Sequence, residues 1–164
     1  MPRDLRLSRM LHVLIHMDRH VDRVTSDEIA KMISTNAVVV RRMMAGLRER
    51  EIVISEKGHG GGWQLARPLT EITLRDVYEA IGNPPLFNIG PKAVPSECLV
   101  EKAVDARLDT TLQEAEARLL AQFAEIAVED LARDFELRLA DPRNDAETSC
   151  DGACARTGTG GAVR

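Results

Sequence analysis

The chain has 164 residues and a formal net charge of −4, which allows one ordinary domain or a small domain with an extended assembly element. Only 3% of its residues are aromatic, so the core must be built from aliphatic side chains and methionine. No apolar run approaches the length of a membrane span, and the first residues lack the apolar centre of a signal peptide. A membrane protein is therefore excluded, and a cytoplasmic one is expected. Three cysteines do not make a disulfide framework and suit a reducing compartment.

The two halves of the chain differ in charge. Residues 1–82 contain 13 Lys and Arg against 11 Asp and Glu, whereas residues 83–164 contain 9 against 15. A basic half joined to an acidic half favours a polyanion-binding module carried by a separate assembly or sensing module.

Two helices are predicted first. Apolar residues recur at steps of three and four between Leu7 and His20, as on an amphipathic helix. Thr25 and Glu28 have the spacing of a capping box, which predicts a short helix over residues 26–33.

A turn and a basic helix follow. Residues 34–36 (Ser-Thr-Asn) favour a turn and a new helix start, and a third helix is expected over residues 37–50. It carries four arginines, and the short turn before it is typical of a helix-turn-helix. A plain helical bundle is the alternative.

A β-hairpin is predicted next. Residues 52–54 are β-branched, residues 56–62 are rich in glycine, and residues 63–66 alternate again. A helix-turn-helix followed by a hairpin is a winged helix. We expect Trp63 to pack beneath the wing rather than to contact a ligand.

The second half predicts an assembly element. Thr73 is expected to cap a helix over residues 74–81, and residues 83–97 contain four prolines and form an irregular connector. Residues 98–140 lack Gly and Pro, which favours long helices. A shorter closing helix over 128–139 is expected to fold back over the domain, and the sequence does not fix the break before it. The predicted domains are a winged helix-turn-helix over 1–82, the connector, dimerisation helices over 98–140, and a disordered tail over 141–164.

An apolar seam along the long helix predicts a homodimer. A helix over residues 98–123 would extend on the order of 39 Å, longer than the small domain can cover. The same helix of a second subunit is the simplest partner for its exposed seam. The predicted dimer interface comprises Leu108, Leu112, Ala115 and Leu119.

Several segments together resemble a known family. They are TNAVVVRRMMAGLREREIV, the wing GHGGGWQLARP, EITLRDVYEAIG, and the late cysteine of SECLVEKAV. The chain resembles the Rrf2-type winged-helix transcription regulators, the family of IscR and NsrR, over roughly residues 7–139. The resemblance implies a dimeric bacterial transcription regulator that binds DNA. It also implies a mostly helical fold with a small β-hairpin wing, and a sensor between the wing domain and the long helix.

Cysteine usage separates this chain from the cluster-binding members. Those members place three cysteines in the connector and at the start of the long helix, and only Cys98 matches here. Lys92 and Leu86 stand six and twelve residues earlier, and neither binds iron. No cofactor is therefore expected.

Cys98 is instead predicted to act as a sensor. It stands at the start of the long helix, where unpaired amides favour the thiolate. Either an oxidant or a small molecule beside Cys98 is the expected signal, and an inert cysteine is the alternative. Cys150 and Cys154, in the tail, are interpreted as an accidental pair.

The expected DNA contacts lie in the turn, the basic helix and the wing. Short polar residues approach base edges, cationic side chains reach phosphates or guanine, and valine can contact a thymine methyl. The residues are Thr35, Asn36, Val38, Arg41, Arg42, Lys57 and His59.

His12, His16 and His20 recur every four residues, a spacing that can bind a metal. No acidic or cysteine ligand completes the set, so a partly buried helix face is the favoured interpretation.

No catalytic constellation is apparent, and an enzyme is not expected. The predicted partner is a double-stranded DNA operator. Two alternative functions remain: a winged-helix module that binds only proteins, and a regulator that depends on a metal or an iron-sulfur cluster.

Overall fold

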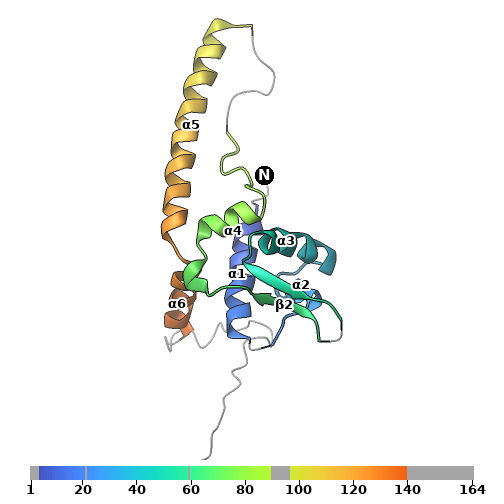
Figure 1. The fold of residues 1–164 in the computed structure, drawn as a ribbon. Helices are drawn as coiled ribbons and strands as arrows, with labels where there is room; N and C mark the ends of the chain where they lie inside the picture. Colours follow the sequence, from blue (N-terminus) through green and yellow to red (C-terminus); the bar gives the residue numbers. More distant parts are fainter. Residues whose placement is uncertain (1–3, 21, 59, 90–96, 140–164) are drawn as a thin grey trace, which may run out of the picture.

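A helical domain with a β-hairpin wing carries one long projecting helix (Figure 1). The computed structural model describes residues 4–20, 22–58, 60–89 and 97–139. The described elements confirm the predicted fold class, a mostly helical winged helix-turn-helix with a long additional helix. In chain order they are α1 (Arg6–Arg19), α2 (Ser26–Met32), α3 (Ala37–Glu49), β1 (Val53–Glu56), β2 (Gly62–Leu65), η1 (Leu69–Glu71), α4 (Leu74–Ala80), α5 (Leu99–Glu125) and α6 (Val128–Leu139).

The predicted helix caps are present. The Thr25 hydroxyl accepts from the Glu28 amide at 3.3 Å, and the Glu28 carboxylate accepts from the Thr25 amide at 2.7 Å. The Asn36 side-chain oxygen accepts from the Val39 amide at 3.0 Å. These bonds satisfy amides that have no partner inside the helix; the first two fix the start of α2, and the Asn36 bond fixes the start of α3 after the turn.

The wing is anchored through Trp63. β1 and β2 are antiparallel, with Val53 opposite Leu65. The Trp63 side chain is buried, as predicted, and its indole N–H donates to the Ser26 hydroxyl at 3.0 Å. Its backbone also pairs with Val24 in an isolated antiparallel bridge. The hairpin is therefore attached to the segment that begins α2.

Helix α3 packs closely against the end of α4. Val40, Met44 and Leu47 of α3 are fully buried in the core. On an adjacent side of the helix, a Cβ placed on Gly46 would lie 2.0 Å from the Ala80 carbonyl oxygen. Because no real Cβ approaches an oxygen so closely, a glycine is required where the two helices meet.

The long helix leaves the domain, while the final helix returns to it. α5 projects away from the body, and α6 lies beside α1 (Figure 1). At the junction the Leu74 amide donates to the Ile126 carbonyl at 3.0 Å, and the Val128 amide donates to the Ile72 carbonyl at 2.8 Å. Val128 is fully buried in the core.

Side chains secure both helices. Tyr78 of α4 is buried, donates to the Pro84 carbonyl at 2.8 Å, and meets Phe123 of α5 edge to face. On the other side, Arg19 of α1 pairs with Glu136 at 3.0 Å and lies over the ring of Phe135. The predicted closing helix therefore does fold back over the domain.

Candidate nucleic-acid interface

The outward face of α3 combines arginines with exposed valines. Arg41 and Arg42 are exposed, and Val38 is 64% exposed. Val40, two residues further along, is fully buried, as expected if one valine of this run serves packing. A large apolar side chain at the solvent-facing start of a helix has no role in the core, so Val38 is available for contact with another molecule.

The arginines of α3 differ from most other arginines in their ion pairing. Arg23 pairs with Glu56, Arg50 with Glu79 at 2.7 Å, and Arg75 with Glu79 at 2.9 Å. Within the described ranges, Arg41, Arg42 and Arg48 form no ion pair. Their charges are therefore available to an external anion.

Thr35 and Asn36 lie at the entrance to α3. Asn36 is exposed and Thr35 half-buried. The carboxamide oxygen of Asn36 is engaged by the Val39 amide, while its NH₂ group has no recorded protein partner among the described residues. Asn36 can therefore cap the helix and still donate a hydrogen bond outward.

The wing contributes Lys57, which is exposed at the end of β1. Gly58 and Gly60 near the hairpin tip have φ values of +102° and +77°, a region that favours glycine. The predicted contact of His59 lies outside the described residues.

Cys98 directly precedes α5 and is exposed. The backbone amides of Glu101 and Val100 lower the pKa of its thiol. The thiolate fraction at neutral pH therefore exceeds that of an ordinary cysteine. Cys150 and Cys154 lie outside the described residues.

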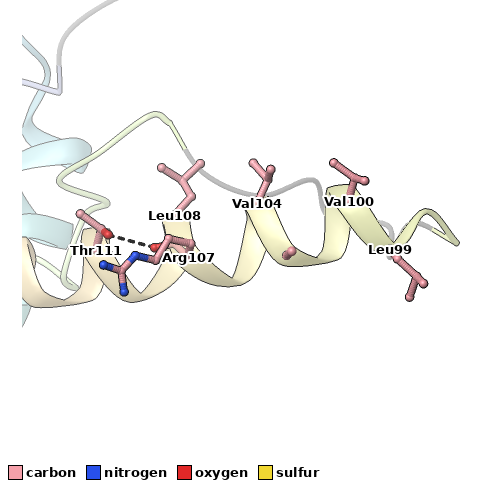
Figure 2. Close-up of a pocket in the computed structure, with 7 residues that line it drawn as sticks. Leu99, Val100, Val104, Arg107, Leu108 and Thr111 are labelled. Atoms are coloured by element: carbon pink, nitrogen blue, oxygen red, sulfur yellow. Dashed lines mark hydrogen bonds between the residues drawn. The ribbon is translucent and has the colours of Figure 1, made fainter.

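The long helix exposes apolar side chains near Cys98. No residue of α5 is buried, and Leu99, Val100 and Val104 are more than half exposed. Figure 2 shows Val100, Val104 and Leu108 projecting from the same side of the helix, with Leu99 pointing away from them. They belong to a shallow groove lined by Leu99, Val100, Ala103, Val104, Arg107, Leu108 and Thr111.

The predicted dimer residues are unevenly exposed. Leu108, Leu112 and Leu119 are half-buried, and Ala115 is exposed. The apolar surface most open to solvent therefore lies in the first half of α5, closer to Cys98 than the predicted set. Exposure of Leu99 next to the connector was not anticipated from spacing alone.

Two histidines of α1 lie together, apart from the α3 surface. The ring centroids of His12 and His16 are 4.6 Å apart. His16 is buried, whereas His12 and His20 are exposed, so the predicted partly buried face holds for one of the three. Burial lowers the pKa of His16, and the positive charges of His12, His20 and Arg19 lower it further.

Comparison with known proteins gives a consistent result. The model of the family Rrf2, described as "Iron-dependent Transcriptional regulator", matches residues 4–134. The chain is 31% identical over 129 residues to YwnA of Bacillus subtilis (strain 168), which is named as an HTH-type transcriptional regulator. The match covers 77% of this chain and 93% of YwnA.

Solved structures share the fold. A Lactobacillus plantarum protein described as a transcriptional regulator has a TM-score of 0.67 at 25% identity, covering 80% of this chain and 90% of that one. CymR of B. subtilis, the global cysteine regulator, has a TM-score of 0.55 at 19% identity, covering 81% and 97%. IscR of T. potens has a TM-score of 0.56 at 17% identity, covering 82% and 88%.

The residues do not fit the iron that the family description implies. No group of three or more His, Cys, Asp or Glu side chains gathers into a metal-holding set within the described part of the chain. Cys98 is the one cysteine there, and an iron-sulfur cluster is normally held by four ligands, mostly thiolates. No helix in that part is long and apolar enough to span a bilayer.

Proposed function

Because the chain belongs to the Rrf2 family of transcriptional regulators, we propose that it binds a two-fold symmetric DNA operator as a homodimer and represses transcription. The observation that carries the proposal is the α3 surface, where Arg41 and Arg42, which form no ion pair among the described residues, lie one turn from the exposed Val38. Guanidinium groups suit phosphates and guanine, and the valine suits a thymine methyl. α3 would enter the major groove, and Lys57 of the wing would reach the neighbouring phosphates.

A gel-shift titration tests DNA binding. We expect the purified protein to shift duplex fragments from the region upstream of its own gene more tightly than unrelated fragments. Affinity should fall steeply with salt, because each phosphate contact releases counterions. If no duplex is bound at low ionic strength, the chain would instead be a winged-helix module for protein partners.

The dimer is proposed to form through the first half of α5. A helix that buries none of its residues, and exposes Val100 and Val104 on one side, resembles one half of a helix pair. A two-fold dimer through this seam would hold two copies of α3 at a fixed separation, as a palindromic operator requires.

Val104→Glu is expected to weaken the dimer by about 100-fold or more, since burying an unpaired carboxylate at an apolar interface costs several kcal/mol. Sedimentation velocity over a concentration series measures this effect. Ala106→Glu is the matched control, because Ala106 is exposed on the opposite side of the helix and should leave association unchanged. Equal behaviour of the two variants would contradict the assigned seam.

The signal is proposed to act at Cys98. Peroxide or hypochlorite would oxidise the thiolate to a sulfenic acid beside the α5 seam, altering the separation of the two α3 helices and hence DNA affinity. A small molecule in the groove of α5 is the alternative effector. Cys98→Ser should make DNA binding indifferent to oxidant, and a variant that still responds would eliminate the thiol as sensor.

The lowered pKa of Cys98 gives a separate test. The rate of alkylation by iodoacetamide can be measured for each cysteine by mass spectrometry from pH 6 to pH 10. We expect the rate for Cys98 to begin its increase with pH at a lower pH than the rates for Cys150 and Cys154 of the same chain. The reason is that the thiolate reacts and the amides of α5 stabilise it. Coinciding profiles for all three thiols would show that the start of α5 does not activate Cys98.

A further inference from the structure

The paired imidazoles of His12 and His16 have no role in the proposed DNA or dimer contacts. Both residues lie in the continuous part of α1, four positions apart, and therefore on one face of the helix. Their ring centroids are 4.6 Å apart and the ring planes are inclined by 46°. Inclined rings at this distance allow one nitrogen of each to point at a common atom about 2.0–2.1 Å away, the usual length of a metal–imidazole bond.

His16 is unusual because it is buried without a hydrogen bond. Only 8% of the residue is exposed, yet neither ring nitrogen has a hydrogen-bond partner within the described residues. Solvent nevertheless reaches these nitrogens. Among the described residues, a side-chain nitrogen that is both enclosed and without a partner occurs in Arg67 and not in His16. Ring nitrogens in this position take a water or a metal ion as their partner.

Two neighbouring cationic side chains, His20 and Arg19, act on the pair, and a carboxylate offsets one of them. Arg19, one turn beyond His16, would repel a cation. Its guanidinium is paired with Glu136 of α6 at 3.0 Å, which reduces that repulsion. The described residues supply no third His, Cys, Asp or Glu ligand, so the remaining coordination positions are open to water.

We propose that His12 and His16 together bind one divalent late transition-metal ion of the nickel, copper or zinc class. Imidazole ligands suit these ions, and affinity for nitrogen sites is higher for Ni²⁺ and Cu²⁺ than for iron. The site is separate from Cys98 and does not depend on the proposed DNA binding. Because the two ligands come from successive turns, the bound ion also links those turns and stabilises α1.

Calorimetric titration with NiCl₂ tests the site. The protein should be full-length and free of a polyhistidine tag, with Cys98, Cys150 and Cys154 replaced by serine so that thiolates cannot bind the metal. We expect one Ni²⁺ per chain. His12→Gln and His16→Gln should each weaken binding by about tenfold or more. Ni²⁺ should also raise the thermal midpoint of the parent protein and leave that of His12→Gln unchanged.

The controls separate the pair from other histidines. His20→Gln removes an exposed imidazole at the end of the same helix and should bind Ni²⁺ as the parent does. His12 is exposed, so its replacement keeps the test valid even if His16→Gln fails to fold. Absence of Ni²⁺ binding in the parent, unchanged binding in His12→Gln, or an equal loss in His20→Gln would each overturn the proposal.

Discussion

The double replacement Arg41→Ala with Arg42→Ala is expected to lower operator affinity by about 100-fold or more while leaving the fold intact. Each guanidinium contact to guanine or phosphate contributes about 1–3 kcal/mol, and 1.4 kcal/mol corresponds to a factor of ten. Both side chains are exposed and form no described ion pair, so their loss removes no interaction within the protein. Gel-shift titration measures the affinity, and a thermal melt checks the fold.

Salt dependence shows what kind of contact is lost. If both arginines contact phosphates, the slope of log affinity against log salt should decrease by about two. If they contact bases, the slope should stay unchanged while discrimination between operators falls. The matched control is Arg75→Ala with Arg133→Ala, which removes the same charge from arginines already paired with carboxylates on α4 and α6. Wild-type affinity in the α3 variant would show that the reading surface lies elsewhere.

Gly46→Ala is expected to destabilise the protein by about 2 kcal/mol, the net of a clash and a smaller gain in helix propensity. Two effects compete. Alanine favours a helix over glycine by about 1 kcal/mol, but its Cβ would lie 2.0 Å from the Ala80 carbonyl oxygen. Overpacking usually costs about 1–3 kcal/mol, and here the obstacle is backbone that no rotamer change can move aside, so the larger effect is the clash. Urea denaturation followed by circular dichroism measures the change.

A neighbouring substitution calibrates that result. Ala45→Gly lies on the same helix and should cost only the propensity difference of about 1 kcal/mol. If Gly46→Ala proved more stable than the wild type, the contact between α3 and the end of α4 would have to be looser than the structure gives. Changing the Ala80 side chain should not rescue Gly46→Ala, because the obstructing atom is a main-chain oxygen.

Local signals predicted the elements well. The capping box of Thr25 and Glu28 and the cap at Asn36 are set by hydrogen bonds within a few residues, so spacing alone reveals them. The glycine-rich hairpin and the long helix without Gly or Pro are similarly local. The 3₁₀ turn at Leu69–Glu71 was missed, because no periodic pattern can be recognised over three residues.

Contacts between distant residues could not be predicted in this way. Gly46 carries no signal in a helical stretch, since its role depends on where Ala80 lies in space. Which arginines form ion pairs could also not be predicted without the fold. Arg50, for example, pairs with Glu79, which is 29 positions away in the sequence. The arginines of α3 were correctly placed on the surface, but spacing could not show that they lack partners.

The junction between α5 and α6 is joined to the rest of the domain by main-chain atoms. Ile126 accepts from Leu74 at the start of α4, and the other end of α4 abuts Gly46 of α3. If the projecting helix tilts as proposed, α4 is one element that contacts both its base and the helix that carries the basic surface. This linkage consists of a main-chain hydrogen bond and a contact between a glycine and a carbonyl oxygen, so it depends little on which side chains α4 carries. If the proposed signal tilts α5, the same main-chain route would serve an oxidised thiol and a bound small molecule equally.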